Sequence, residues 1–276
     1  MILFVIPIGN LCLNEIYYFS QPSQKTKMEK HLLSKSTFIR GNQCLKSLYL
    51  NKKRPFLRDR LSPEQRAKFQ RGHKIGDLAQ KLFPGGIDMR PKSPSQYQKR
   101  VLEVQHLISI ATHDIIYEVT FQYDQLLAIL DILVKENGNW NAYEVKSSLK
   151  ISDTYLLDSA FQYYVITNSG LILNDFFLIH INPDYQFEGI PDIEKLFVKV
   201  SVLDEVLKLQ NYIKEQSQRG KDTLFLEKSP LIDPGSQCIN PYPCDFIGHC
   251  WKKIPKENWP VIKHGSEKFY DFLNKL

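Results

Sequence analysis

The chain has 276 residues, of which 24% are charged and 43% hydrophobic, an ordinary balance for a globular protein with a sizeable core. Its formal net charge of +6 and its pI of about 8.9 permit a polyanionic partner without requiring one. No apolar run approaches the length of a membrane span, so the sequence predicts no membrane partner.

The first 27 residues differ in sequence character from the rest of the chain. They begin Met-Ile-Leu-Phe-Val-Ile-Pro-Ile, without a preceding positive charge and with an early proline, and match a secretory signal poorly. The alternative interpretation is that Met28 is the natural start. We expect residues 1–33 to form an extension, residues 34–230 the main domain, and residues 231–276 a C-terminal loop and tail.

Five cysteines are present: Cys12, Cys44, Cys238, Cys244 and Cys250. An odd number, with three crowded near the C-terminus, does not resemble the disulfide framework of a secreted protein. The pattern favours a metal or cluster site in a reducing compartment, which predicts a cytoplasmic protein.

A basic and aromatic stretch lies near the start of the main domain. Residues 34–50 predict a short helix, a break at Gly41-Asn42, and a second helix with Cys44 at its start. The mixture of side chains that follows suits the backbone of a nucleic acid, and a solvated basic surface explains it equally well. The residues are Lys46, Tyr49, Lys52, Lys53, Arg54, Phe56, Arg58 and Arg60.

A capped helix is predicted over residues 62–83. Ser62 and Gln65 have the spacing of a capping box, and a Pro-Gly-Gly sequence ends the helix. Gly72 and Gly76 lie on one helical face, and because glycine lowers helix stability we expect close backbone packing there.

Residues 95–112 predict another helix, and residues 115–121 alternate as a strand. Glu118 is expected to point away from the apolar face of that strand. The residues expected on the apolar face are Ile115, Tyr117, Val119 and Phe121.

A β-hairpin follows. Asn137-Gly138 is a strong hairpin-turn signal, because both residues tolerate a positive φ. This turn sets a register in which Asp131 lies directly opposite Glu144, and Lys146 shares the face of Glu144. Opposed carboxylates are destabilising, so we expect Mg²⁺ or Mn²⁺ between them; the alternative is the solvated polar face of an ordinary hairpin.

The remaining elements complete a layered fold. Residues 154–168 predict a helix with Tyr155, Asp158 and Gln162 near one face. A strand over residues 173–181 and an amphipathic helix over residues 203–217 are also predicted. A hairpin core surrounded by helices predicts an α/β or α+β layered domain.

The three C-terminal cysteines lie in a stretch rich in proline and glycine, which predicts a loop. Three thiolates in a loop call for a fourth ligand, for which Cys44 is the best candidate and His249 the competitor. Four thiolates hold either a [4Fe–4S] cluster or a structural Zn²⁺, and the spacing does not separate the two. Unligated buried cysteines are the remaining alternative.

The strand aspartate Asp131, the Glu144-Val145-Lys146 motif, the helical Gln162 and the split cysteines resemble the PD-(D/E)XK nucleases. The likeness is to the RecB-like branch with an iron–sulfur staple, which includes CRISPR-adaptation and AddB-type exonucleases, and to an uncharacterised bacterial family related to it. It covers residues 34–252. It implies a restriction-endonuclease-like core with a central mixed sheet. Gly76 stands where the branch often has a metal-binding histidine, and Glu118 is expected to take that role.

The resemblance implies a metal-dependent deoxyribonuclease, exonuclease-like, in DNA repair or defence. Asp131 and Glu144 would be metal ligands, with the Val145 carbonyl and Glu118 as further ligands. Lys146 would position the water or the phosphate, and Gln162 would orient the site or the DNA. A [4Fe–4S] cluster would be held by Cys44, Cys238, Cys244 and Cys250. Alternatives are a nuclease fold that binds DNA or a protein partner without cutting, and a structural zinc protein.

Overall fold

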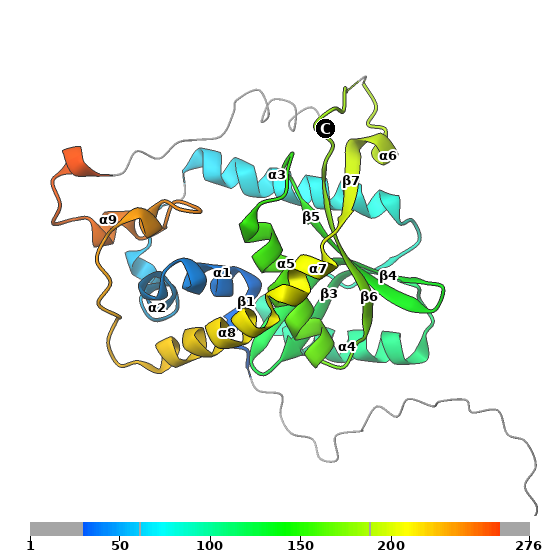
Figure 1. The fold of residues 1–276 in the computed structure, drawn as a ribbon, viewed down its shortest axis with the longest axis horizontal. Coiled ribbons are helices and arrows are strands. Elements are labelled where there is room, and N and C mark those ends of the chain that lie inside the picture. Colours follow the sequence, from blue (N-terminus) through cyan, green and yellow to red (C-terminus); the bar gives the residue numbers. More distant parts are fainter. Residues whose placement is uncertain (1–29, 61, 188, 260–276) are drawn as a thin grey trace, which may run out of the picture.

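The structure, a computed structural model, describes residues 30–60, 62–187 and 189–259 (Figure 1). The signal-like run, the start at Met28 and Cys12 all lie outside the described residues. The sheet begins just inside the expected extension, with strand β1 (Leu33–Ser34).

Within the described residues, seven strands form one mixed sheet, which confirms the layered α/β fold. Besides β1, they are β2 (Ile87–Asp88), β3 (Ile115–Tyr123), β4 (Leu126–Glu136), β5 (Asn139–Lys146), β6 (Leu173–Ile181) and β7 (Phe197–Ser201). β3, β4 and β5 pair antiparallel in chain order, β6 is parallel to β5, and β7 is antiparallel to β6. β2 pairs parallel with β3, and β1 pairs parallel with the start of β4.

Helices cover both faces of this sheet (Figure 1). The larger core lies under α1 (Lys35–Gln43), α4 (Tyr97–Ile110), α5 (Asp153–Asn168), α7 (Leu203–Lys208) and α8 (Gln210–Phe225). A second core lies on the other face, under α3 (Pro63–Ala79) and α6 (Ile193–Leu196). A small third cluster joins α2 (Leu45–Lys53) to α9 (Ile247–Cys250). None of the described helices is long and apolar enough to cross a membrane.

Several helix boundaries differ from the prediction. The first helix continues through Gly41-Asn42 to Gln43, and Cys44, with an extended backbone, separates it from α2. Gly41 is needed for packing instead, because an added Cβ would lie 2.9 Å from Leu48 Cδ2. The helix predicted over residues 203–217 is two helices that meet at Leu209 and continue to Phe225.

The predicted capping box of α3 is confirmed. Ser62 Oγ accepts from the backbone N–H of Gln65 at 3.2 Å, and Gln65 Oε1 accepts from the backbone N–H of Ser62 at 2.9 Å. The expected close packing at Gly72 and Gly76 is wrong, because apart from adjacent residues and the backbone of α3 itself, no atom of the described residues lies within 4 Å of a Cβ built at either position.

The two glycines of α3 therefore supply a stability prediction. Gly72→Ala and Gly76→Ala should each raise the free energy of unfolding by about 1 kcal/mol, because alanine fixes the helical backbone at a lower entropic cost. Urea denaturation followed by circular dichroism measures this. Gly86→Ala is the contrasting variant and should destabilise, because its Cβ would collide with Tyr117 and Ile115. A loss of stability at Gly72 or Gly76 would contradict the prediction.

The residues of β3 do not share one face as the alternation predicted. Ile115 and Tyr117 pack into the core beneath α3, whereas Val119 and Phe121 pack into the larger core. Between them Glu118 has a φ of 54°, in the left-handed region that a non-glycine residue seldom adopts. β4 makes the matching switch, with Leu130 in the larger core and Ile132 in the other. In both strands the change of face occurs at one pair of opposing positions, Glu118 on β3 and Asp131 on β4.

Candidate functional site

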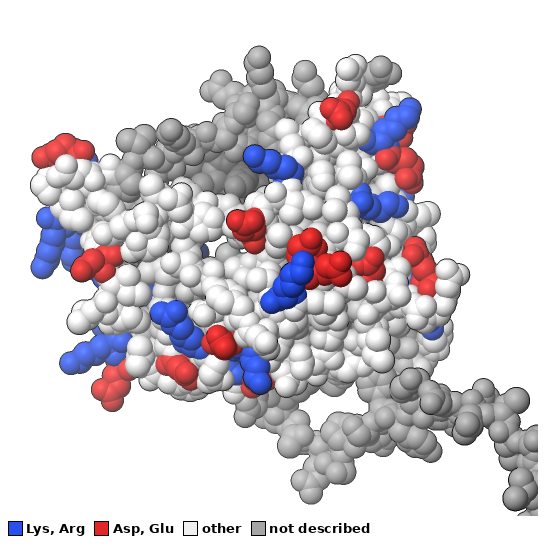
Figure 2. Space-filling view, in the orientation of Figure 1, with Lys and Arg blue, Asp and Glu red and all other residues white. Residues whose placement is uncertain are grey.

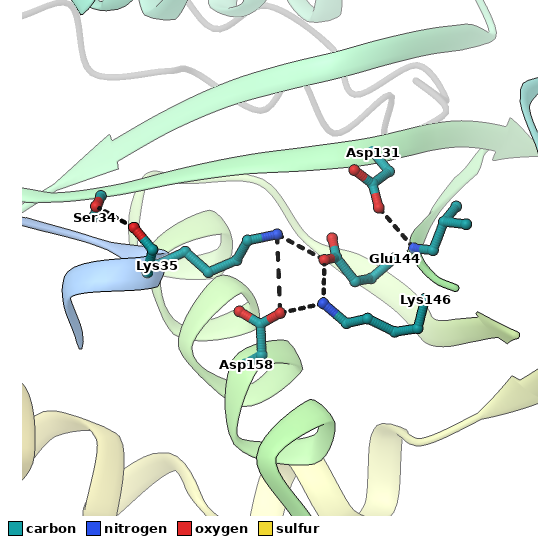
Figure 3. A network of polar contacts seen from close by, with 8 residues as sticks. Ser34, Lys35, Asp131, Glu144, Lys146 and Asp158 are labelled. Atoms are coloured by element: carbon teal, nitrogen blue, oxygen red, sulfur yellow. Dashed lines mark hydrogen bonds and ion pairs between the residues drawn. The ribbon is translucent and has the colours of Figure 1, made fainter. Parts of the chain in front are cut away.

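The predicted hairpin and its register are confirmed. Asn137 and Gly138 both have positive φ, and the rungs run from Glu136 opposite Asn139 to Ile132 opposite Tyr143. The paired residues end there, and the next positions in the same register are Asp131 and Glu144. Asp131 Oδ2 accepts a hydrogen bond from the Val145 N–H at 2.7 Å, which holds its carboxylate beside that of Glu144 (Figure 3).

A third carboxylate extends the same row. Tyr117 pairs with Ile132 and Val119 with Leu130, so Glu118 lies across from Asp131 on the neighbouring strand. Its carboxylate binds Arg90 at 2.9 Å. Burial raises the pKa of Glu118, and Arg90 partly opposes that shift. Glu118, Asp131 and Glu144 thus follow one another across three strands, an arrangement that costs stability without a nearby cation.

Two lysines supply positive charge on one side of this row. Lys35 Nζ and Lys146 Nζ both bind Glu144 Oε1, each at 2.6 Å. Lys146 also donates to Asp158 Oδ2, and Lys35 Nζ lies 3.9 Å from the same oxygen. Figure 3 shows the four side chains as a closed ring of alternating charge, built from α1, β5 and α5. The charge that offsets Glu144 in this structure therefore comes from two ammonium groups.

The ring sets the protonation of the site. Burial would raise the pKa of Glu144, but the charges of Lys146 and Lys35 hold it below its ordinary value. Burial would lower the pKa of both lysines, but Asp158 and Glu144 raise it. Asp131 lies outside the ring, and burial together with the charge of Glu144 raises its pKa. Asp131 forms no ion pair among the described residues, and its raised pKa favours the neutral carboxyl.

Unpaired buried atoms mark the site as one that fits a further ligand. Glu144 is only 2% exposed, and its Oε2 has no hydrogen-bond partner among the described residues. The same holds for Asp158 Oδ1 and for both atoms of the Gln162 amide. Carboxylate oxygens without donors suit a hard divalent cation. Among the described residues, no three His, Cys, Asp or Glu side chains already lie in the arrangement of a metal site.

Sequence reasoning missed Lys35 and gave no role to Asp158. Lys35 lies 109 residues before Glu144, and a lysine at the start of a short helix carries no signal of such a contact. Asp158 offers a weak signal, because it precedes Gln162 by one helical turn and the two share a face of α5.

The four cysteines outside the extension line one small cavity. Cys44 comes from the junction of α1 and α2, and Cys238, Cys244 and Cys250 come from the C-terminal segment. All four thiols are free, and the short helix α9 interrupts the predicted loop. His249 does not line this cavity.

Hydrogen bonds hold the C-terminal segment against the first two helices. Gln43 Nε2 donates to the carbonyls of Gln237 and Tyr242, both at 2.7 Å, and Lys46 Nζ donates to Ile232 O at 3.0 Å. Figure 1 shows the chain after α8 returning past α2 to α9. Burial raises the pKa of the Cys244 and Cys250 thiols, while the nearby positive charge of Lys46 lowers that of Cys250. Four thiols in one cavity next to a lysine have the chemistry of a metal or cluster site, although among the described residues no three of them lie in the arrangement of one.

Some residues of the basic stretch make contacts inside the protein, and the others are exposed to solvent. Lys46 binds a backbone carbonyl, and Tyr49 is buried with its hydroxyl donating to Glu227 O at 2.9 Å. Phe56 is 77% exposed. The other exposed members are Lys52, Lys53, Arg54, Arg58 and Arg60. On the described part of the face in Figure 2, basic side chains are spread singly and interrupted by acidic ones.

No family model matches the chain, and no curated protein matches it. Among solved structures, the chain is similar to one described as "Crystal structure of SSO0001", with 12% sequence identity and a TM-score of 0.32. The match covers 83% of this chain and 87% of the other. A likeness at this level carries no argument about function.

Proposed function

We propose that the protein is a metal-dependent deoxyribonuclease that hydrolyses phosphodiester bonds. The observation that carries the proposal is the pair of carboxylates on the hairpin, in which Asp131 Oδ2 accepts the Val145 N–H and Glu144 Oε2 has no hydrogen-bond partner among the described residues. A buried acidic row with two lysines beside it suits a divalent cation and a phosphate together.

Asp131 and Glu144 would hold Mg²⁺ or Mn²⁺, with Glu118 and the Val145 carbonyl as further ligands. When bound, the cation lowers the pKa of a coordinated water and stabilises negative charge on the phosphate. Lys146, bound to Glu144 and Asp158, fixes the Glu144 carboxylate so that Oε2 is left for the cation. Gln162, buried one turn beyond Asp158, would orient the site or the DNA.

The cysteines are assigned a separate, structural role. Cys44, Cys238, Cys244 and Cys250 would hold a [4Fe–4S] cluster, with Zn²⁺ as the alternative, since four thiolates suit either. The exposed basic residues around Phe56 would contact DNA phosphates, and an exposed aromatic side chain among them suits stacking on an unpaired base.

The test is cleavage of end-labelled single- and double-stranded DNA by anaerobically purified protein, in Mg²⁺, in Mn²⁺ and in EDTA. Products that appear only with a divalent cation support the proposal. Binding without cleavage would instead favour a non-catalytic DNA-binding module. Protein that neither cleaves nor binds DNA would overturn the proposed function. Brown protein with iron supports the cluster, and colourless protein with zinc supports the alternative.

A further inference from the structure

The two lysines of the charged ring have different amounts of unused hydrogen-bonding capacity. Lys146 binds Glu144 and Asp158 and lies 5.3 Å from the centre of the Tyr155 ring, and its side chain is 15% exposed. Lys35 makes one hydrogen bond, to Glu144, and its only other ion pair among the described residues is the longer one to Asp158 at 3.9 Å; its side chain is 27% exposed. An ammonium has three donors, so two donors of Lys35 remain without an acceptor among the described residues.

The backbone around Lys35 is firmly placed. Leu33 and Ser34 pair with Leu126 and Leu127 of β4, and the Ser34 N–H donates to Thr37 Oγ1 at 2.7 Å. Lys35 is the first residue of α1, where the unpaired N–H groups of a helix create a partial positive charge. Its ammonium is therefore held at a fixed position beside the acidic row, with donors left for an anion.

The net charge of the site also favours binding of an anion near Lys35. A metal ligand must be deprotonated, so cation binding removes the proton that the raised pKa of Asp131 retains. With Asp131, Glu144 and Asp158 then ionised, these carboxylates outnumber Lys35 and Lys146 by one negative charge. A bound divalent cation would reverse that balance to one positive charge, which a single phosphodiester group neutralises. Two lysines are needed for this balance, and Lys146 alone does not supply it.

We propose that Lys35 binds the substrate phosphate at the cleavage position, whereas Lys146 positions the carboxylates. This inference rests on the proposed nuclease function. It assigns substrate binding to a residue of the N-terminal helix, outside the hairpin. The ion pair of Lys35 with Glu144 persists and keeps the ammonium in place, while its two remaining donors take the phosphate oxygens.

The test is the salt dependence of DNA binding, measured by fluorescence anisotropy of a labelled oligonucleotide with Ca²⁺ in place of Mg²⁺. Each phosphate contact contributes about 0.7 to the slope of log K against log salt for single strands and about 0.9 for duplexes. Lys35→Gln, which keeps a donor for Glu144 but no charge, should lower the slope by that amount. It should also raise KM more than it lowers kcat. Lys35→Arg should restore the slope, and Lys146→Gln should lower kcat and leave the slope unchanged.

Lys214→Gln is the matched control, because it removes one exposed charge from α8 and should leave the slope unchanged. An unchanged slope in Lys35→Gln, with normal cleavage by the wild type, overturns this inference alone. A wild type that neither binds nor cleaves DNA overturns the proposed function itself. If Lys35→Gln does not fold, Lys35→Met, which keeps the aliphatic stem, takes its place. If neither folds, Lys35 is a structural residue and the inference is wrong.

Discussion

Asp131→Asn should reduce metal-dependent DNA cleavage by at least about a hundredfold while the protein stays folded. Mutating a residue that only hydrogen-bonds to a metal ligand typically lowers metal affinity or activity by about ten- to a hundredfold. Mutating a direct ligand should lower activity by at least as much. The fold should survive, because the amide oxygen of asparagine can still accept the hydrogen bond that the Val145 N–H now gives to Asp131. Initial rates in Mg²⁺ and Mn²⁺, together with circular dichroism, measure both effects.

The same variant should gain stability in the absence of metal. Burial raises the pKa of Asp131 in the folded protein, so between its unfolded pKa and its folded pKa the native state holds the additional proton. The stability of the wild type must therefore fall as the pH rises from about 4 into the neutral range. Asparagine does not titrate, so Asp131→Asn should be more stable by about 1 kcal/mol near pH 8 and show no such gain below about pH 4.

Denaturant unfolding in EDTA across this pH range measures the difference. Asp204→Asn, at an exposed position of α7, is the control and should change neither cleavage nor the pH profile. Normal cleavage by Asp131→Asn would exclude Asp131 as a ligand. A variant that loses stability at neutral pH would show that the hydrogen bond to Val145 outweighs the buried charge.

Cys44→Ala should give colourless, poorly soluble protein that is destabilised as a whole. Cys44 precedes the sheet and the other three cavity cysteines follow it, so a shared metal or cluster closes a loop of about two hundred residues. Closing a loop of that length removes entropy from the unfolded chain that corresponds to about 5 kcal/mol. Loss of the bound group should therefore lower the melting temperature of the sheet as well as that of the C-terminal segment.

Iron and zinc content after anaerobic purification, with hydrogen exchange of the sheet amides, measures this effect. Cys12→Ala is the control and should behave as wild type, since the proposed cluster assignment gives Cys12 no role. Anaerobic wild-type protein without iron or zinc would refute the assignment. Loss of protection confined to residues 231–259 in Cys44→Ala would refute the loop-closure argument.

The hairpin was predictable because its turn fixes its register locally. Asn137-Gly138 determined which residue faces which, and the rungs from Glu136 to Ile132 follow that register. The switch of faces at Glu118 was not predictable, because it depends on a positive φ that glutamate seldom adopts. Strands β1 and β2 have two residues each, too few for an alternating pattern.

The placement of Cys44 beside the three C-terminal cysteines was expected from residue type, and all four line one cavity, whereas the ring around Glu144 was not expected. A fourth thiol far from the other three was the natural candidate for a shared site, so Cys44 was proposed despite its distance along the chain. Lysines are common, and nothing separates Lys35 from the other lysines until the packing of α1 against α5 is known. Contacts between ordinary charged residues far apart in sequence are set by tertiary packing, which the local pattern does not contain.

The length of α1 fixes the spacing between the carboxylate site and the cysteine cavity. This helix has nine residues, begins with Lys35 at the acidic row and ends at Gln43, directly before Cys44 in the lining of the thiol cavity. Each residue of an α-helix turns the chain by about 100° and advances it by about 1.5 Å. A single insertion or deletion within α1 would rotate Cys44 away from the cavity or Lys35 away from Glu144. Relatives of this chain should therefore vary in length in their exposed loops, and keep the spacing between this lysine and this cysteine constant.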